Sequence, residues 1–380
     1  MSEYRIMVVA GEPSGDLHAS RLLQQLNLRD HQFHCYGIGG KRMRQQGFNA
    51  VVGIEQMAVM GLIEIVRHFP YLFGVLRKMR ALLKTDPPDL LILVDYPGFN
   101  MLLAKTAKKL GIKVLYYVSP KIWVWRVGRV HKIAKRVDHM ALIFPFEAPY
   151  YERVGVAATY VGHPLVGEVS SSNSVEEARV KIGIDPDKKT IGLFPGSRRG
   201  EVQQLLPDLL KSAREIYVHD SKVQFVISQA PDLSSSLFSG VELFDDVPLT
   251  IVKGDVHTVI RGCDAIATAS GTVTLEMALL ETPMVVIYRV SPISYWLLSH
   301  LIKTEYISLV NIVAEREVVP ELLQENASAS SIAPYLLSIL DDGEERRRVV
   351  GGLRDVKSRL GSGDSASRLA DLVEEMLHEQ

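Results

Sequence analysis

Two turns in the second half of the chain have the residue types that hold phosphate groups. Pro195-Gly196-Ser197-Arg198 follows the apolar run TIGLF, and Ser270-Gly271-Thr272 follows the apolar run AIATA. A turn between a strand and a helix presents free backbone N–H groups and the positive end of the helix dipole, which together favour a bound anion. Two such turns in one half of a chain predict a diphosphate ligand.

Charged side chains next to these turns are candidates to complete the site. Arg198 and Arg199 offer guanidinium groups that match phosphate oxygens and would stabilise the charge on a departing diphosphate. A solvated basic pair is disfavoured at a helix start, because a cation there needs an anion nearby. Glu276 lies about one helical turn beyond Thr272, where it could accept hydrogen bonds from the two hydroxyls of a ribose. A surface glutamate is an equally open interpretation.

The first half of the chain carries an acidic turn, GEPSGD, directly after its first predicted strand. Gly11 and Gly15 permit a tight turn and the close approach of a ligand. Ser14 or Asp16 could cap the following helix, so a simple capped turn stays open as an alternative. Glu12 caps nothing obvious and is a candidate catalytic carboxylate, and the residues around it are candidates for substrate binding.

A second candidate carboxylate, Asp95, ends the apolar run LLILVD. Pro97 and Gly98 break the strand after it, so Asp95 is expected at the carboxyl end of the strand. A carboxylate in that position could act as the general base for a hydroxyl nucleophile. A helix cap or a salt bridge in the loop is the alternative interpretation.

Metal ions and nicotinamide cofactors are not indicated. The histidines at 18, 131, 139, 163 and 257 lack metal-ligand spacing, and no complete G-x-G-x-x-G follows the first strand. We therefore predict no metal and no cofactor, with arginine side chains and helix termini balancing the diphosphate.

Composition sets the class of protein. The chain has 380 residues, 47% of them apolar, and a net charge of -1 from 43 basic and 44 acidic residues. That length predicts two domains, and the balanced charge argues against a nucleic-acid partner. Cys35 and Cys263 are isolated, which favours a reducing cytoplasm. The N-terminus is interpreted as a strand and not a signal peptide, and no apolar run is long enough to span a membrane.

Short β-branched runs alternate with longer amphipathic stretches in both halves, which predicts an α/β protein with two doubly wound parallel sheets. A small, polar stretch at 166–174 is interpreted as the linker. Ligands of such folds bind at the carboxyl ends of strands, so a cleft between the domains is the default site. The predicted strands are 5–10, 33–37, 90–95, 113–118, 139–143, 190–194, 223–227, 249–252, 265–268 and 284–288.

Two stretches, 57–84 and 292–303, are more apolar than simple surface helices. The first mixes Arg, Lys and His with Leu, Ile, Phe and Tyr, as helices at an anionic lipid surface do. Helices packed on the sheets are the alternative interpretation of both stretches.

Together these motifs resemble the lipid-A-disaccharide synthase family. The motifs that carry the resemblance are GEPSGD (11–16), VDYPGFN (94–100), VSPKIWVWR (118–126), FPFE (144–147), VGHP (161–164), PGSR (195–198), ASGTVTLE (269–276), KTEYISLVN (303–311) and PELLQ (320–324). The resemblance implies an inverting glycosyltransferase (family 19) of the GT-B type, with two Rossmann-like domains facing a central cleft. It also implies a cytoplasmic enzyme, peripheral on the inner face of the inner membrane, that joins UDP-2,3-diacylglucosamine to 2,3-diacylglucosamine 1-phosphate.

The resemblance also implies roles for single residues. Glu12 and Asp95 fall at the acids of two motifs, with Asp95 as the general base, and Arg198 falls at a functionally important arginine. Asn311 and Gln324 match polar positions of the C-terminal motif. Gly98 stands where the family usually has a second Asp. The acceptor and the membrane are assigned to 1–165 with a C-terminal helix at about 355–380, and UDP-sugar to 175–354. A UDP-sugar 2-epimerase and an NAD-dependent dehydrogenase remain alternatives.

Overall fold

The computed structural model describes residues 2–57, 62–125, 127–169, 173–291 and 304–378. The chain forms two compact units, one of Met1–Pro164 with Gly361–Gln380 and one of Leu165–Leu360. Of the two predicted interfacial stretches, 292–303 lies outside the described residues, as do 58–61 of the first. Arg126 of the VSPKIWVWR motif is also outside them.

The first unit is built on a parallel sheet with the strand order β3-β2-β1-β4-β5-β6-β7. Its central strands are buried over nearly their whole length, which explains why they are continuously apolar. Ala10 at the end of β1 pairs with Val94 at the end of β4, so the loops that follow these strands begin side by side. The strands are β1 (Glu3–Ala10), β2 (Gln32–Gly39), β3 (Asn49–Gly53), β4 (Leu90–Val94), β5 (Lys113–Tyr117), β6 (His139–Leu142) and β7 (Ala157–Tyr160).

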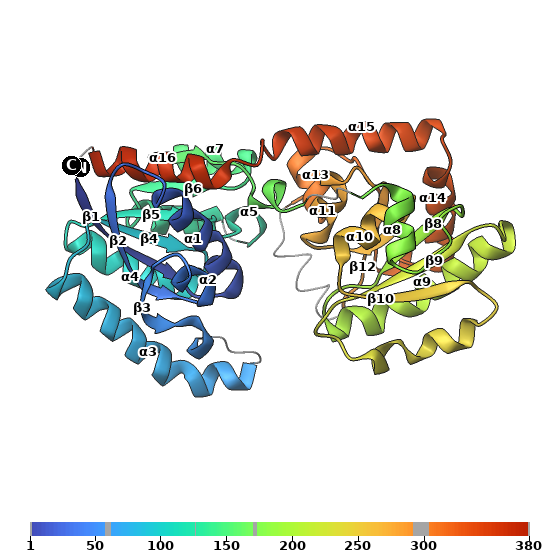
Figure 1. Ribbon diagram of the computed structural model, residues 1–380, viewed down its shortest axis with the longest axis horizontal. Coiled ribbons are helices and arrows are strands. Elements are labelled where there is room, and N and C mark those ends of the chain that lie inside the picture. Colours follow the sequence, from blue (N-terminus) through green and yellow to red (C-terminus); the bar gives the residue numbers. More distant parts are fainter. Residues whose placement is uncertain (1, 58–61, 126, 170–172, 292–303, 379–380) are drawn as a thin grey trace. The chain divides into compact units, whose positions relative to one another are not determined.

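The last helix of the chain, α16 (Ser365–His378), belongs to the first unit and packs against α1 (Pro13–Leu26). Its buried side chains follow the spacing of one helix face, at 369, 372, 373, 376 and 377, and they join the core of β1 and β4. Figure 1 shows α16 in red along this unit. The other helices of the unit are α2 (Lys41–Arg44), α3 (Leu62–Thr85), α4 (Pro97–Lys109), α5 (Ile122–Trp125), α6 (Val130–Ala134) and α7 (Ala148–Glu152).

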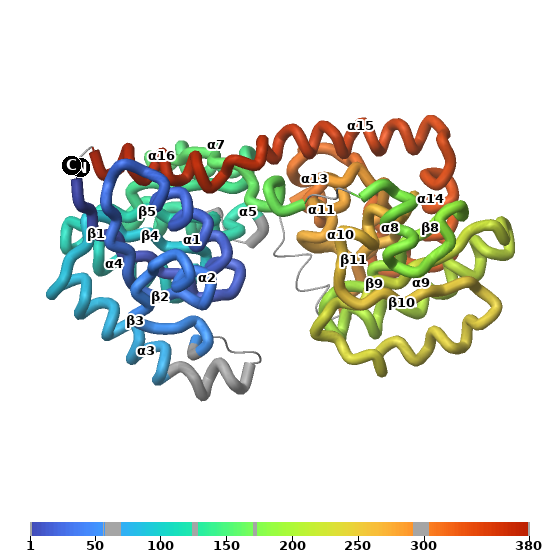
Figure 2. The backbone as a smooth tube through the Cα atoms, viewed as in Figure 1, coloured from blue at the N-terminus to red at the C-terminus, as the bar shows by residue number. Residues whose placement is uncertain are grey.

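The second unit has a parallel sheet with the order β10-β9-β8-β11-β12-β13. Phe194 at the end of β8 pairs with Thr268 in β11, so the two predicted phosphate turns leave neighbouring strands. In Figure 2, α15 runs along the side of the unit that holds α11 and α13. The strands are β8 (Thr190–Phe194), β9 (Gln224–Gln229), β10 (Leu249–Lys253), β11 (Ala265–Ala269), β12 (Met284–Tyr288) and β13 (Glu321–Leu323). The helices are α8 (Val175–Lys181), α9 (Arg199–His219), α10 (Val256–Gly262), α11 (Val273–Leu279), α13 (Leu309–Ala314), α14 (Ala329–Leu340) and α15 (Glu344–Arg359).

The predicted α/β class is confirmed, and each predicted strand is present with its ends shifted by at most a few residues. Three strands were not predicted, namely β3, β7 and β13, and each lies at an edge of its sheet. Edge strands are covered on fewer sides, so their sequences lack the continuous apolar run by which buried strands are recognised. The predicted linker ends in Ser174, which caps α8 through a reciprocal capping box with Glu177.

Candidate active site

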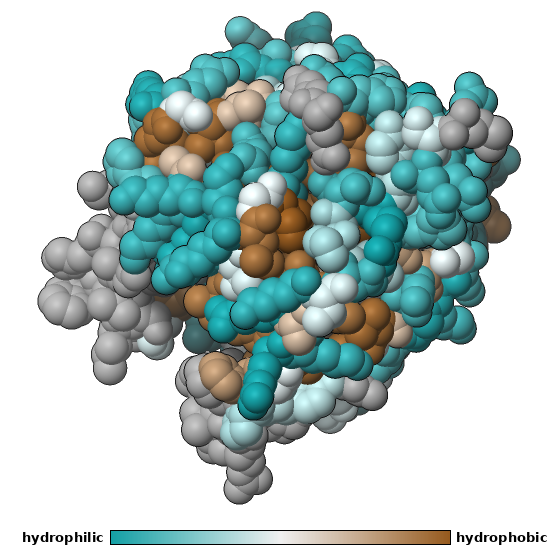
Figure 3. Space-filling model, turned by 90° about the vertical axis from the view of Figure 1, so that its left-hand side faces the viewer, coloured by the Kyte–Doolittle hydropathy of each residue, from teal (hydrophilic) through white to brown (hydrophobic). Residues whose placement is uncertain are grey.

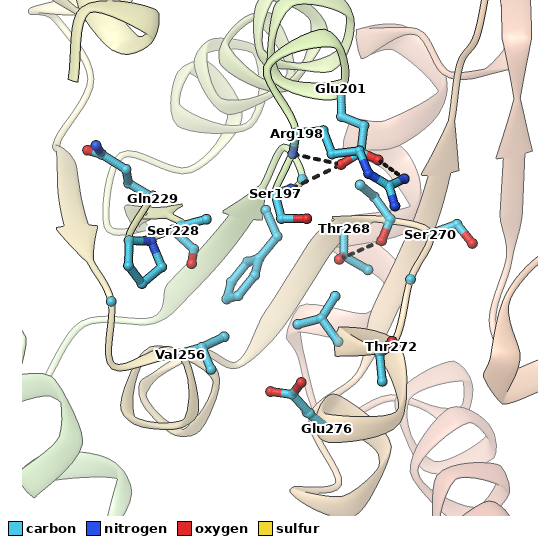
Figure 4. A pocket seen from close by; sticks show the side chains of 18 residues that line it. Ser197, Arg198, Glu201, Ser228, Gln229, Val256, Thr268, Ser270, Thr272 and Glu276 are labelled. Carbon is cyan, nitrogen blue, oxygen red and sulfur yellow. Dashed lines mark hydrogen bonds and ion pairs between the residues drawn. The ribbon is translucent and has the colours of Figure 1, made fainter. Parts of the chain in front are cut away.

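A pocket of about 380 Å³ opens at the carboxyl ends of β8, β9 and β11 in the second unit. Figure 4 shows Arg198 and Glu201 on one side of the pocket, with Val256 and Glu276 on the opposite side. Both predicted phosphate turns contribute to its wall, which confirms that they meet. Lining residues include Gly196, Ser197, Arg198, Glu201, Ser228, Gln229, Gly254, Val256, Ser270, Gly271, Thr272 and Glu276.

The first turn is shaped around the carboxylate of Glu201. The backbone amides of Ser197 and Arg198 donate to its Oε2 at 3.0 and 3.1 Å, and Nη1 of Arg198 lies 3.2 Å from its Oε1. Gly196 has a φ of 111°, and a Cβ there would lie 2.4 Å from the same Oε2, so only glycine fits. The amides expected to be free for phosphate are therefore taken by an internal anion. The Arg198 side chain is 84% exposed and available, whereas Arg199 is exposed outside the pocket lining.

The second turn leaves its space open. Ser270 lines the pocket, and its hydroxyl donates to the carbonyl of Ile307 at 3.2 Å. A Cβ added to Gly271 would meet no described atom within 4 Å. Thr272 precedes the first residue of α11 and makes no side-chain cap there. The turn thus presents small residues to the pocket with room for a ligand.

Glu276, for which ribose binding stays a prediction, projects into the pocket from α11. Its side chain is 16% exposed, and its Oε2 lies 3.1 Å from Nε2 of His257 on α10. Burial raises the pKa of Glu276, while the charge and the hydrogen bond of His257 oppose this rise. His257 was not predicted as a site residue, because nothing in the sequence places residues 257 and 276 together.

Two predicted binding residues of the C-terminal motif are occupied by the protein itself. Asn311 is fully buried, its amide donates to the carbonyl of Val319 and to Glu321, and its Oδ1 accepts from the amides of 318 and 319. Gln324 exchanges two hydrogen bonds with the backbone of Val290. These contacts give both side chains a structural role, since every polar atom of each already has a partner, and a contact with a ligand stays a prediction.

Asp16, another predicted binding residue, also has partners within the protein. Its carboxylate accepts hydrogen bonds from the amides of Gly40 (2.6 Å), Arg42 (3.1 Å) and Met43 (3.2 Å), so it fastens the start of α2 and does not cap α1. Ser14 is exposed in the first turn of α1 and also caps nothing, because the N-cap position belongs to Glu12.

The glycines of the acidic turn serve packing. A Cβ on Gly11 would lie 2.5 Å from the ring of Tyr96, so glycine lets this ring close over the end of β1. Gly15 is buried against Ala10 and Val94, with room for ordinary contacts only. Neither observation tests a contact with substrate, which stays a prediction for both.

Glu12 and Asp95 follow the neighbouring strands β1 and β4, and the charge of Asp95 acts on Glu12. The pKa of Glu12 is raised by partial burial and then by the charge of Asp95. The pKa of Asp95 is raised by burial, which outweighs the amide of Tyr96 and the charge of Lys121. Among the described residues, no side chain donates a hydrogen bond to either carboxylate. Because its pKa is raised, each of these carboxylates is a stronger base than an ordinary carboxylate.

Asp95 is held in a strained backbone conformation by two residues that were not predicted. Asp95 and Tyr96 both have a φ of 46°, a left-handed region that is costly for residues other than glycine. The carbonyl of Asp95 accepts hydrogen bonds from the amide of Asn100 at 2.7 Å and from the hydroxyl of Tyr116 at 2.6 Å. Asn100 lies in the quoted VDYPGFN motif, which is the signal that could have found it.

A third carboxyl of the first unit, Glu147 of the FPFE motif, is buried. Its Oε1 accepts a hydrogen bond from the indole of Trp123 at 3.2 Å, and its Oε2 has no partner among the described residues. Burial raises the pKa of Glu147 to about 8. A neutral acid therefore ties the FPFE segment to the loop that follows β5.

The sequence matches known proteins over nearly its whole length. Residues 6–370 match the family described as lipid-A-disaccharide synthetase. A lipid-A-disaccharide synthase of Geobacter metallireducens is 46% identical over 373 residues, which cover 98% of this chain and 97% of that protein. The chain belongs to the lipid-A-disaccharide synthetase family. It is therefore a glycosyltransferase of lipid A biosynthesis, and the family resemblance predicted from the motifs is confirmed.

Solved structures with the same fold include glycosyltransferases and epimerases. The calicheamicin glycosyltransferase CalG4 matches with a TM-score of 0.62 at 16% identity, over 100% of this chain and 99% of that one. A protein from Listeria monocytogenes assigned as a UDP-N-acetylglucosamine 2-epimerase matches with a TM-score of 0.70 at 12% identity, over 100% and 98% of the chains. Identities this low show the fold alone. The predicted GT-B class is confirmed, and family membership separates the synthetase from the epimerase and dehydrogenase alternatives.

Proposed function

We propose that the enzyme transfers 2,3-diacylglucosamine from UDP to the 6-hydroxyl of 2,3-diacylglucosamine 1-phosphate, with inversion at C1 of the donor sugar. The products are the β-1,6-linked disaccharide 1-phosphate and UDP. Family membership supports the class of reaction. The observation that carries the residue roles is Asp95, a strand-end carboxylate with a raised pKa, fixed through its backbone and without a side-chain donor among the described residues.

In this proposal UDP binds in the pocket of the second unit. Glu201 already accepts hydrogen bonds from the backbone amides of Ser197 and Arg198. We therefore assign the diphosphate to the guanidinium of Arg198 and to the 270–272 turn. Glu276 accepts hydrogen bonds from the ribose at the other side of the pocket. Positive charge from Arg198 and the turn amides balances the diphosphate, so the proposed reaction runs without a divalent cation.

The proposed chemical step is a single displacement. The carboxylate of Asp95 takes the proton of the acceptor 6-hydroxyl while that oxygen forms a bond to C1 of the donor sugar. The bond from C1 to the diphosphate oxygen breaks on the opposite face, its electron pair leaves with UDP, and Arg198 stabilises the charge that develops. Attack from the face opposite the leaving group inverts C1, by the logic of inverting glycosidases. Glu12 orients the acceptor beside Asp95.

The test is a transfer assay with radiolabelled acceptor and purified Asp95→Asn, Glu12→Gln and Arg198→Ala variants. We expect Asp95→Asn to lose most of the turnover while it keeps its affinity for UDP, and Arg198→Ala to lose both. Near-normal turnover of Asp95→Asn would refute the base assignment. Conversion of UDP-N-acetylglucosamine to its 2-epimer without any acylated acceptor would refute the transferase proposal itself. EDTA is expected to leave the rate unchanged.

We also propose that α3 touches the cytoplasmic surface of the inner membrane. Tyr71 and Phe73 of α3 are 38% and 59% exposed, and Arg77 and Lys84 on the same helix are exposed as well. Apolar side chains next to basic ones suit an anionic lipid interface. In the view of Figure 3, apolar patches of the surface are separated by hydrophilic residues. Among the described residues, no helix is long and apolar enough to cross a bilayer.

Sedimentation with phosphatidylglycerol vesicles tests this contact. Phe73→Ser is expected to reduce the bound fraction, and Leu28→Ser, at another exposed apolar position of the same unit, serves as the control. Equal binding of both variants and of the unaltered protein would place the lipid contact elsewhere.

A further inference from the structure

Glu276 lies on the wall of the pocket opposite Arg198, and His257 contacts its carboxylate. Glu276 lines the pocket, whereas His257 lies outside the lining and reaches it only through Glu276. Nε2 of His257 is 3.1 Å from Oε2 of Glu276. One oxygen of the carboxylate is therefore held from behind, and no described side chain donates to Oε1.

We infer that His257 is a positioning residue for the nucleotide: it holds Glu276 in the rotamer in which the carboxylate accepts hydrogen bonds from the ribose hydroxyls. The ligand recognised in this way is a ribonucleoside diphosphate as opposed to its 2′-deoxy form. The inference rests on the proposed function, since it takes UDP to be the ligand of the pocket.

The helix that carries His257 is fixed at its first turn. Asp255 precedes α10 in a left-handed conformation with a φ of 45°. Its carboxylate accepts a hydrogen bond from Thr258 at 2.7 Å and forms an ion pair with Lys181 of α8 at 2.7 Å. Lys181 also donates to the hydroxyl of Thr258 at 3.2 Å. These contacts tie the start of α10 to α8, so His257 approaches Glu276 from a backbone with little freedom to shift.

Electrostatics gives His257 a second effect on the carboxylate. An ionised carboxylate accepts hydrogen bonds from two hydroxyls more strongly than the protonated acid, in which one oxygen carries a proton. Burial and the charge of Glu168, which directly follows the 3₁₀ turn Pro164–Gly167, both raise the pKa of Glu276, and the charge and hydrogen bond of His257 lower it. His257 therefore favours the ionised form that the ribose contact needs.

A purely structural role for His257, as a link between α10 and α11, predicts a different outcome. Loosening that link would disturb the whole pocket, because Val256 and Gly254 next to it also line the wall. All ligands would then bind more weakly by a similar factor. A positioning role predicts a loss confined to ligands that carry the ribose hydroxyls.

The experiment measures the affinities of UDP, 2′-deoxy-UDP and inorganic pyrophosphate by calorimetry for the full-length enzyme and its variants. His257→Ala removes the contact, and His257→Gln keeps a donor near the position of Nε2 without the ring. Glu276→Gln marks the full loss of the ionised acceptor. His219→Ala, at an exposed histidine at the end of α9 in the same unit, is the matched control. Thermal unfolding of each variant shows whether it is folded.

We expect His257→Ala to bind UDP roughly tenfold more weakly, with 2′-deoxy-UDP and pyrophosphate changed less than about twofold, so that the preference for UDP over its deoxy form falls. His257→Gln should recover part of that preference. An unchanged preference in His257→Ala would overturn the inference, and so would an equal loss for all three ligands. If the unaltered enzyme binds no UDP, the proposed function fails instead, which is a separate result.

Discussion

The candidate acids of the two units differ in their hydrogen-bond partners. In the first unit, Glu12 and Asp95 follow neighbouring strands, and no described side chain donates to either carboxylate. In the second unit, the acids in the first turns of α9 and α11 are already bonded, Glu201 to two backbone amides and Glu276 to His257. The first unit keeps two acids to which no described side chain donates, and the second keeps a pocket whose acids are held by other groups of the protein.

This difference matches what the two halves of a transfer reaction need. A general base must be free to take a proton, and its basicity rises when nothing stabilises its charge. A binding pocket is more effective when its side chains are ordered beforehand, because ordering them on binding costs free energy. In the first unit Asn100 and Tyr116 hold the backbone carbonyl of Asp95, and no described side chain donates a hydrogen bond to its carboxylate.

Replacing Asp95 is the strongest test of this comparison. Asp95→Asn is expected to lower kcat by about 10²–10⁴-fold, because the amide cannot accept the proton of the acceptor. UDP affinity, measured by calorimetry, should stay within about twofold of the unaltered enzyme. Asp86→Asn, which removes an exposed ion pair with Arg5 in the same unit, is the matched control and should keep its activity. Comparable losses in both variants would indicate damage to the unit as a whole.

Glu147 is a buried and hydrogen-bonded acid of the first unit, and it makes stability depend on pH. Its pKa is raised from an ordinary 4.5 to about 8. Below the lower value both states carry the proton. Between the two values the folded state keeps a proton that the unfolded state has lost, so a rise in pH favours unfolding. Above about 8 the cost of the buried charge is complete, on the order of 5 kcal/mol.

Glu147→Gln is therefore expected to flatten the dependence of the free energy of unfolding on pH between about 5 and 8. Urea unfolding at several pH values measures it, and Glu152→Gln, on the helix that follows, is the control. If the variant and the unaltered protein lose stability in parallel as pH rises, Glu147 is not the group responsible.

Much of the fold could be predicted from the sequence, because buried parallel strands are continuously apolar and break at Gly or Pro. The pocket was also predictable, since two Gly-containing turns after strands imply helix starts that face the same side of a sheet. The edge strands β3, β7 and β13 could not be predicted, because their partial exposure removes the apolar signal.

The partners of polar side chains could not be predicted in the same way. Asp16, Asn311 and Gln324 have the composition and position of ligand-binding residues, yet each is bonded to backbone groups brought near by folding. The residue type shows which hydrogen bonds a side chain can donate or accept, and only the folded structure shows the partners in those bonds. Glu201 is an exception, since a glutamate three residues after a helix start has capping-box spacing and could have been noticed.

The support of Asp95 can be weakened without touching its carboxylate. Tyr116→Phe removes one of the two hydrogen bonds to the carbonyl of Asp95. We expect kcat to fall roughly tenfold with KM unchanged for both substrates, because the base is displaced while binding is retained. Tyr151→Phe, which deletes another buried hydroxyl of the same unit, is the control and should keep kcat. A rise in KM without a fall in kcat would contradict a positioning role.

For Glu201, the hydrogen-bonded acid next to Arg198 in the second unit, we expect a smaller change in the opposite direction, which is a gain in UDP affinity. Glu201→Gln removes a negative charge next to the proposed diphosphate and keeps an acceptor for a backbone amide of the turn. UDP affinity is expected to increase about threefold, or roughly 0.7 kcal/mol, since exposed charge interactions are weak. Glu215→Gln, exposed further along α9, is the control for a change of net charge. Weaker binding of UDP to Glu201→Gln would mean that the carboxylate is needed to hold the turn in shape.

Adding an acid to the first unit is the mildest change. Gly98 is exposed in the first turn of α4, which has no acidic residue, and a Cβ there would meet no described atom within 4 Å. Gly98→Asp should raise the free energy of unfolding by about 0.5–1 kcal/mol, since it restricts the unfolded chain and complements the helix dipole.

The unaltered chain has glycine at position 98, so the kcat of Gly98→Asp should change less than about twofold at neutral pH. A new charge near Asp95 would raise the pKa of that base further, and the pH profile of kcat would then shift upward, as like charges require. Gly111→Asp, just beyond the far end of the same helix, should leave the pH profile of kcat unchanged, and because Gly111 has a φ of 76° it should lower the free energy of unfolding instead of raising it. A gain in kcat far beyond twofold would mean that the rim of the first unit works with two cooperating acids and not with one unpaired base.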